Sequence, residues 1–132
     1  MLGTLAAGSS PLASRARWTL ALAELDRGNT AKARELTLAD ASFAESIQGQ
    51  EILARAALAS DNRKESTRIY EKLGDQSVDA MIFLSKEAFA AENFADARRW
   101  TLTLARRFPE RPEFRKNLLK IDEAEAAKSK KP

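Results

Sequence analysis

Apolar residues recur at spacings of three, four and seven along most of the chain, which is the pattern of amphipathic helices. The clearest stretch is Lys86–Pro109, KEAFAAENFADARRWTLTLARRFP. Its apolar residues fall into two stripes that are interrupted at Glu92-Asn93. Pro109 ends the second stripe because its ring cannot continue the helical hydrogen-bond ladder. The stretch therefore predicts two helices joined by a tight turn.

The same pattern occurs twice more upstream, with a period of 33 and then 31 residues. Each copy has a large apolar residue followed by a small one, then a turn, then a second small residue. The apolar-small pairs are Leu20-Ala21, Leu53-Ala54 and Leu84-Ser85; the turns are Gly28-Asn29, Asp61-Asn62 and Glu92-Asn93; the second small residues are Ala33, Ser66 and Ala97. This regularity predicts three consecutive helix-turn-helix units.

The repeat resembles the tetratricopeptide repeat family, whose small positions fall on the residues just named and whose repeat-ending proline falls on Pro109. The chain departs from that family in three ways. The aromatic residue early in each first helix is missing, with Trp18 one place late; only the first turn has a glycine, Gly28; and the first two repeats lack the final proline. Another solenoid of helix pairs is the alternative, because all such repeats share the same packing logic.

The resemblance implies an all-α fold of about seven helices, arranged as a right-handed superhelical solenoid of antiparallel pairs. Its units would be 14–46, 47–77 and 78–109, followed by a capping helix over 110–127 and a polar tail over 128–132. Phe114, Leu118 and Ile121 supply the apolar stripe of the capping helix. Residues 1–13 are either a tail or the remnant of a preceding repeat.

Within these units, the turn and capping signals predict helices over 12–27, 31–40, 45–60 and 63–73 and a third pair that begins near Ser77. Ser9 or Ser10 would cap the first helix, and Asn29 or Thr30 the second. Phe43 is expected to pack under the junction between the first two pairs.

The composition gives no support to catalysis. The chain has no histidine and no cysteine, so the commonest general base, the usual nucleophile pairs, disulfides and the preferred zinc ligands are all missing. Its 5 glycines are isolated, which leaves no phosphate-binding loop. We therefore expect a protein that is not an enzyme, with no catalytic residue, no metal site and no cofactor.

With 44% apolar and 31% charged residues, the 132-residue chain has the balance of a soluble globular domain. No apolar run is long enough to span a membrane, and the start MLGTLAAGSS lacks the features of a signal peptide. Composition does not distinguish the cytoplasm from the periplasm, and we favour the cytoplasm.

In tetratricopeptide-like arrays the first helix of each pair lines a concave groove. Counting along this sequence places nine residues there: Arg15, Trp18, Leu22, Gln48, Glu51, Arg55, Ile82, Lys86 and Phe89. Trp18 and Phe89 are either partner anchors or residues packed between helices. The family's clamp for C-terminal carboxylates is not expected, because its positions hold other residues here, among them Asp79 and Phe83.

A second candidate surface is the segment Arg98–Lys116, which has seven basic and two acidic residues and so a local charge of +5 against +3 for the whole chain. Its candidate residues are Arg99, Arg106, Arg107, Arg111 and Arg115. Cations near a helix C-terminus also stabilise the helix dipole, which is the simpler explanation for Arg106 and Arg107.

Two functions follow from these surfaces. The first is a non-catalytic scaffold that binds a peptide or partner helix, with an acidic group in it, in the groove. The second is a helical-repeat module that binds an anionic polymer, either a nucleic acid or an anionic surface, through Arg98–Lys116. We expect a protein partner rather than a nucleic acid, and we count self-association through exposed repeat ends among the options.

Overall fold

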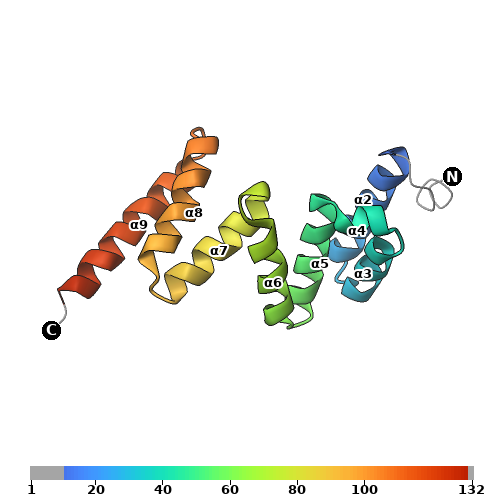
Figure 1. The fold of residues 1–132 in the computed structure, drawn as a ribbon, viewed down its shortest axis with the longest axis horizontal. Coiled ribbons are helices and arrows are strands. Elements are labelled where there is room, and N and C mark those ends of the chain that lie inside the picture. Colours follow the sequence, from blue (N-terminus) through green and yellow to red (C-terminus); the bar gives the residue numbers. More distant parts are fainter. Residues whose placement is uncertain (1–10, 131–132) are drawn as a thin grey trace. The chain divides into compact units, whose positions relative to one another are not determined.

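The computed structural model describes residues 11–130, and all regular secondary structure in that range is helical (Figure 1). The chain divides into two compact units, Met1–Leu73 and Gly74–Pro132, which are described separately. Eight α-helices and one short 3₁₀ helix lie in the described range, without a strand. The all-α prediction is confirmed, whereas the expected number of about seven helices is one too low. Ser9 and Ser10 lie outside the described residues.

The first unit contains α2 (Pro11–Asp26), α3 (Thr30–Leu38), α4 (Ala41–Glu45), α5 (Ile47–Ala59) and α6 (Arg63–Leu73). Helix α2 packs on α3 and α5 packs on α6, while α5 also contacts α2, α3 and α4. The core between these helices is formed by Ala21, Ala33, Phe43 and Ile52. Helix α2 begins at Pro11, three residues before the position where the first repeat was expected to begin.

The additional helix is α4, which occupies the segment that we had expected to be a junction. The Asp40 carboxylate accepts hydrogen bonds from the backbone N–H groups of Ser42 and Phe43, at 3.0 and 3.4 Å, and so caps α4. Ser46 then adopts an extended conformation that ends α4, and its hydroxyl oxygen accepts from the N–H of Gly49 at 3.0 Å. These two capping residues, six positions apart, therefore form a separate short helix where a junction was expected. Phe43 is buried, as the sequence predicted.

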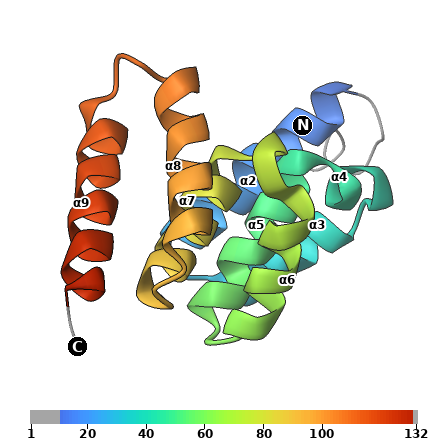
Figure 2. The same cartoon turned by 60° about the vertical axis from the view of Figure 1, so that its left-hand side comes forward.

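The second unit contains η1 (Gly74–Gln76), α7 (Val78–Ala90), α8 (Phe94–Arg107) and α9 (Pro112–Ser129). Helix α8 packs against both α7 and α9, and α8 and α9 lie side by side in both views (Figures 1 and 2). One cluster of buried residues is Met81, Leu104 and Phe114. A second is Phe94, Ala97 and Ile121.

The three predicted turns share one set of backbone hydrogen bonds. The N–H groups of Asn29, Asn62 and Asn93 each donate to a carbonyl five residues earlier, at 2.8 Å in every case. The residue before each asparagine has a positive φ: 81° at Gly28, 63° at Asp61 and 60° at Glu92. This is a Schellman-type helix end, and it occurs at the predicted period of 33 and then 31 residues.

Helices joined by such three-residue turns and packed on each other run antiparallel. The chain therefore contains three sequential helix-turn-helix pairs, namely α2 with α3, α5 with α6, and α7 with α8.

Most of the small positions of the repeat are buried between the packed helices. Ala21, Ala33, Ala54, Ser66 and Ala97 are all fully buried. Ser85 is the exception, because it is only half-buried and its hydroxyl donates to the carbonyl of Ile82 at 2.9 Å. Among the helices described here, none combines the length and the apolar character needed to cross a bilayer.

Candidate partner-binding surfaces

The first unit has a pocket of about 430 Å³ that is lined by α2, α4 and α5. Its lining residues are Ser14, Arg15, Trp18, Ser42, Phe43, Ser46 and Gln48. Three of the predicted groove residues, Arg15, Trp18 and Gln48, therefore lie together. Trp18 fits both interpretations considered above, because its partly buried ring also packs against the core of this unit.

The first unit also contains a buried charged residue, Arg17, that is not among the predicted site residues. Arg17 is only 4% exposed, and its Nη1 donates to the carbonyl of Leu36 at 3.1 Å. Its Nε lies 3.8 Å from Oδ2 of Asp40, the residue that caps α4. Arg17 thus links α2 to α3 and to the start of α4. Its position four residues from both Ala13 and Ala21, on the buried face of α2, could have identified it.

The other predicted residues of this unit do not line the pocket. Leu22 is half-buried and packs against the core. Glu51 is half-buried and Arg55 is exposed, both on α5.

The second unit has a pocket of about 280 Å³ to which α7, α8 and α9 all contribute. Its lining residues are Ser85, Lys86, Phe89, Thr101, Asn117, Lys120 and Ile121. The predicted residues Lys86 and Phe89 lie here, whereas Ile82 packs against the cluster around Met81. The sequence does not predict Asn117 and Lys120 as groove residues, because the resemblance gives the capping helix only the role of covering the last repeat.

Phe89 is the large apolar residue of this pocket that remains accessible, with 39% of its surface exposed. Its ring meets that of buried Phe94 edge to face, with the centroids 6.1 Å apart and the planes at 75°. Such a pair fixes the orientation of the Phe89 ring. The Phe89 ring therefore gives one face of the pocket an aromatic surface that has a fixed orientation and is accessible to solvent.

Two ammonium groups accompany this aromatic surface. Lys86 and Lys120 are exposed, and neither forms an ion pair with any residue in the described range. The remaining side chains supply an amide and two hydroxyl groups, from Asn117, Ser85 and Thr101. This combination suits an apolar side chain next to a carboxylate. No group of three potential metal ligands occurs among residues 11–130.

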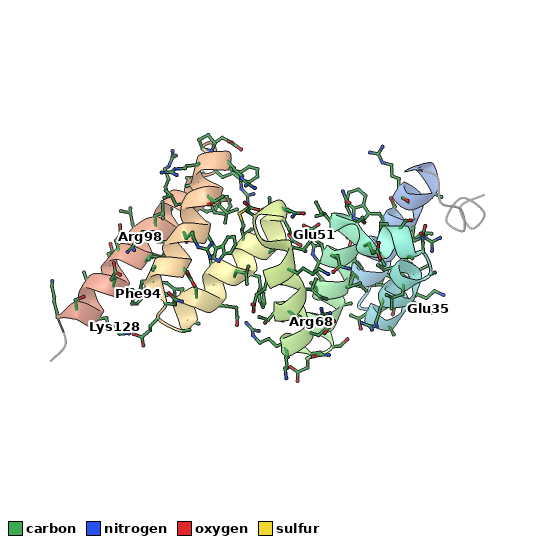
Figure 3. All side chains as sticks on the ribbon, viewed as in Figure 1. Glu35, Glu51, Arg68, Phe94, Arg98 and Lys128 are labelled. Carbon is green, nitrogen blue, oxygen red and sulfur yellow. The ribbon has the colours of Figure 1, made fainter. Side chains whose placement is uncertain are left out.

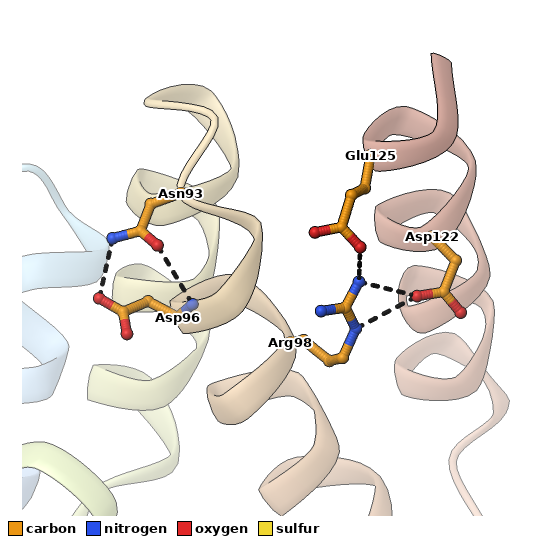
Figure 4. Close-up of polar contacts among 5 residues, drawn as sticks. All are labelled: Asn93, Asp96, Arg98, Asp122 and Glu125. Atoms are coloured by element: carbon orange, nitrogen blue, oxygen red, sulfur yellow. Dashed lines mark hydrogen bonds and ion pairs between the residues drawn. The ribbon is translucent and has the colours of Figure 1, made fainter. Parts of the chain in front are cut away.

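The predicted basic segment is largely engaged in internal contacts. Arg98 on α8 donates to Oδ1 of Asp122 at 3.0 Å and to Oε1 of Glu125 at 2.6 Å, both on α9 (Figure 4). Hydrogen bonds to Glu125 and then Asp122 raise the pKa of Arg98. In the same region the side chain of Asn93 caps α8 by accepting from the N–H of Asp96 at 3.3 Å.

The neighbouring arginines are also partnered. The Arg99 guanidinium lies 4.3 Å from the Trp100 ring, and Nη1 of Arg107 donates to the carbonyl of Asp75 at 2.6 Å. Arg111 donates to Glu113 at 2.6 Å and lies 4.7 Å from the Phe114 ring. The pKa of Glu113 is lowered by a hydrogen bond from its own backbone and by the one from Arg111. Of the seven basic residues, only Arg106, Arg115 and Lys116 form no ion pair with a described residue.

Figure 3 labels Phe94, Arg98 and Lys128 among the side chains of the second unit. Lys128 lies 3.3 Å from the Glu92 carboxylate and 5.8 Å from the Phe94 ring. A further hollow over α6 is bordered by Glu65 and Arg68, whose ion pair at 2.6 Å occupies both charges. The residues that line the α6 hollow include no aromatic or large apolar side chain, unlike those of the α7–α9 pocket.

Comparison of the chain with protein-family models, curated proteins and solved structures finds no match.

Proposed function

We propose that this protein is a non-catalytic interaction module of the tetratricopeptide-like class, and that it binds a peptide or partner helix at α7, the first helix of the third pair. Three features support this proposal: the pairing of the helices, the turn geometry that recurs with a period of 33 and then 31 residues, and the buried small residues at the matching positions. In solenoids of this kind, stacked pairs leave one face of the first helices open to a ligand.

The observation that carries the proposal is the α7–α9 pocket, where the partly exposed ring of Phe89 lies with Lys86 and Lys120, neither of which forms an ion pair with a described residue. The matching ligand is a segment with one aliphatic or aromatic side chain and a nearby Asp or Glu. The apolar group would cover Phe89, and the carboxylate would be held by the ammonium groups through charge-assisted contacts.

The ion pairs of the segment Arg98–Lys116 make binding of an anionic polymer the weaker candidate function. A nucleic acid is bound mainly through unpaired cations that contact successive phosphates. In the segment Arg98–Lys116, four of the seven basic residues already form ion pairs within the second unit. The three that remain make a small electrostatic surface.

Selection from a random peptide library displayed on phage, against the immobilised chain, tests the proposal directly. We expect the enriched peptides to combine a large apolar residue with an acidic one within a few positions. Failure to enrich any peptide, or enrichment of basic peptides, would contradict it.

The site is then tested with two charge-matched variants. Lys86→Glu with Lys120→Glu should weaken the selected peptide about tenfold or more, because like charges now face its carboxylate. Arg106→Glu with Arg115→Glu changes the net charge equally and should leave the peptide affinity within about twofold, since an exposed charge outside the site acts only through a screened field. Isothermal titration calorimetry measures both. Equal losses in the two variants would show that binding is not at the α7–α9 pocket.

A further inference from the structure

Helix α9 has a second face that the pocket does not use. Its inner face places Phe114 and Ile121 in the cores of the second unit. On the outer face Leu119 is 62% exposed, more than any other large apolar residue in the described range. Pro112, Asp122 and Ala126, at helical spacing from Leu119, are exposed as well. An accessible leucine at the middle of an 18-residue helix is therefore the centre of an uncovered stripe.

The charged residues of this stripe are basic on the N-terminal side of Leu119 and acidic on its C-terminal side. Arg115 and Lys116 lie one turn before it, and Asp122 and Glu123 lie one turn after it. Arg115, Lys116 and Glu123 are exposed and form no ion pair with any described residue. Asp122 accepts from Arg98, yet its side chain is still 61% exposed.

We infer that the outer face of α9 binds the same face of a second copy of the chain, with the two helices antiparallel and crossing at Leu119. In this arrangement the two Leu119 side chains meet at the two-fold axis. Arg115 of each copy then faces Asp122 of the other, and Lys116 faces Glu123, because residues seven positions apart lie on the same side of Leu119 and the two-fold axis keeps that side while reversing the direction of the helix. A second copy presents an opposite charge to both the basic and the acidic end of the stripe. A uniformly acidic or basic partner is attracted by one end and repelled by the other.

The proposed contact is small, so we expect the dimer to be weak. A helix of 18 residues is about 27 Å long, and one helix pair of that length buries less surface than a standard protein–protein interface. The dimer should therefore be concentration-dependent. It leaves the α7–α9 pocket accessible, because Asn117 and Lys120 do not belong to the outer stripe.

Sedimentation equilibrium of the full chain over a wide concentration range tests self-association. We expect a monomer–dimer equilibrium that Leu119→Asp weakens about tenfold or more, because the substitution removes the central apolar contact and adds facing like charges. Circular dichroism should show unchanged helix content, since Leu119 is not part of the buried core. A wild-type chain that stays monomeric at millimolar concentration, or a dimer that is unaffected by Leu119→Asp, overturns the inference.

A charge-reversal pair tests the antiparallel arrangement. Lys116→Glu places an acidic group opposite Glu123 of the other copy, and Glu123→Lys places a basic group opposite Lys116, so each variant should dimerise more weakly than the wild type. An equimolar mixture should form a heterodimer, because each Lys116→Glu chain then meets oppositely charged residues at both ends. Non-specific association would not recover in the mixture. Failure of the mixture to associate more strongly than either variant alone contradicts this pairing.

Discussion

At the scale of single residues, the three turns show what the sequence specifies and what it tolerates. Gly28, Asp61 and Glu92 adopt the same left-handed conformation, although only the first is a glycine. For residues other than glycine, the left-handed conformation carries a steric cost of about 1–2 kcal/mol per residue. The repeated turn is therefore imposed at Asp61 and Glu92 by the packing of the helices on either side.

This conformation gives a prediction for Asp61. Asp61→Gly should raise the free energy of unfolding by about 0.5–1 kcal/mol, because it removes the steric cost of the left-handed conformation. Part of that gain is offset, because glycine loses more backbone entropy on folding than aspartate does. Urea denaturation followed by circular dichroism measures the change.

Gly28→Ala is the matched control at the equivalent turn. It should lower the free energy of unfolding by a similar amount, although no atom lies within 4 Å of the added Cβ, because the cost arises from φ alone. If both substitutions shifted the urea midpoint in the same direction, backbone strain at these turns would not be the cause.

At the scale of the elements, Ala97 is a small residue of α8 in a buried cluster to which α7 and α9 also contribute. It is fully buried and clusters with Ala88 of α7 and with Ile121 and Ala124 of α9. Ala97→Leu should therefore cost roughly 1–3 kcal/mol of stability by overpacking.

Ala95→Leu provides the comparison, because Ala95 lies on the same helix and is exposed. It should change the free energy of unfolding by no more than about 0.5 kcal/mol. Equal midpoints for the two variants in a guanidinium titration would mean that α8 does not bury the face that contains Ala97.

The helices could be predicted closely where the local signals are strong. Helix α6 begins and ends at the predicted residues, since Asn62 precedes it and Gly74 follows with a positive φ. The separate helix α4 was missed because the apolar pattern there is short, and only the capping side chains of Asp40 and Ser46 reveal it. Periodicity finds long helices, whereas short ones depend on hydrogen bonds that an apolar pattern does not encode.

The candidate surfaces could be predicted only in part. Counting from the repeat places Lys86 and Phe89 on one face of α7, and that spacing was sufficient to bring them to one pocket. Leu22 and Ile82 were counted in the same way, yet both pack against the core. The first helix of every pair contacts more than one neighbouring element. Which of its apolar residues are buried and which are exposed therefore depends on the distances between helices, and the spacing of residues in the sequence does not give those distances.

At the scale of the whole molecule, the net charge of +3 overstates the electrostatic surface that a partner would meet. The local excess of +5 between Arg98 and Lys116 is reduced by contacts to acidic groups that lie outside that segment, namely Asp75, Asp96, Asp122 and Glu125. Residues distant in sequence therefore decide how many cations remain available.

The salt dependence of binding to a nucleic acid follows from that number. If only Arg106, Arg115 and Lys116 contact phosphates, a plot of log K against log salt for a labelled single-stranded oligonucleotide should have a slope of about −2. Fluorescence anisotropy at several sodium chloride concentrations measures the slope. If all seven basic residues of the segment contacted the strand, the slope would approach about −5. That result would mean that the arginines exchange their internal partners for phosphates, and it would make the anionic polymer rather than the peptide the stronger candidate ligand.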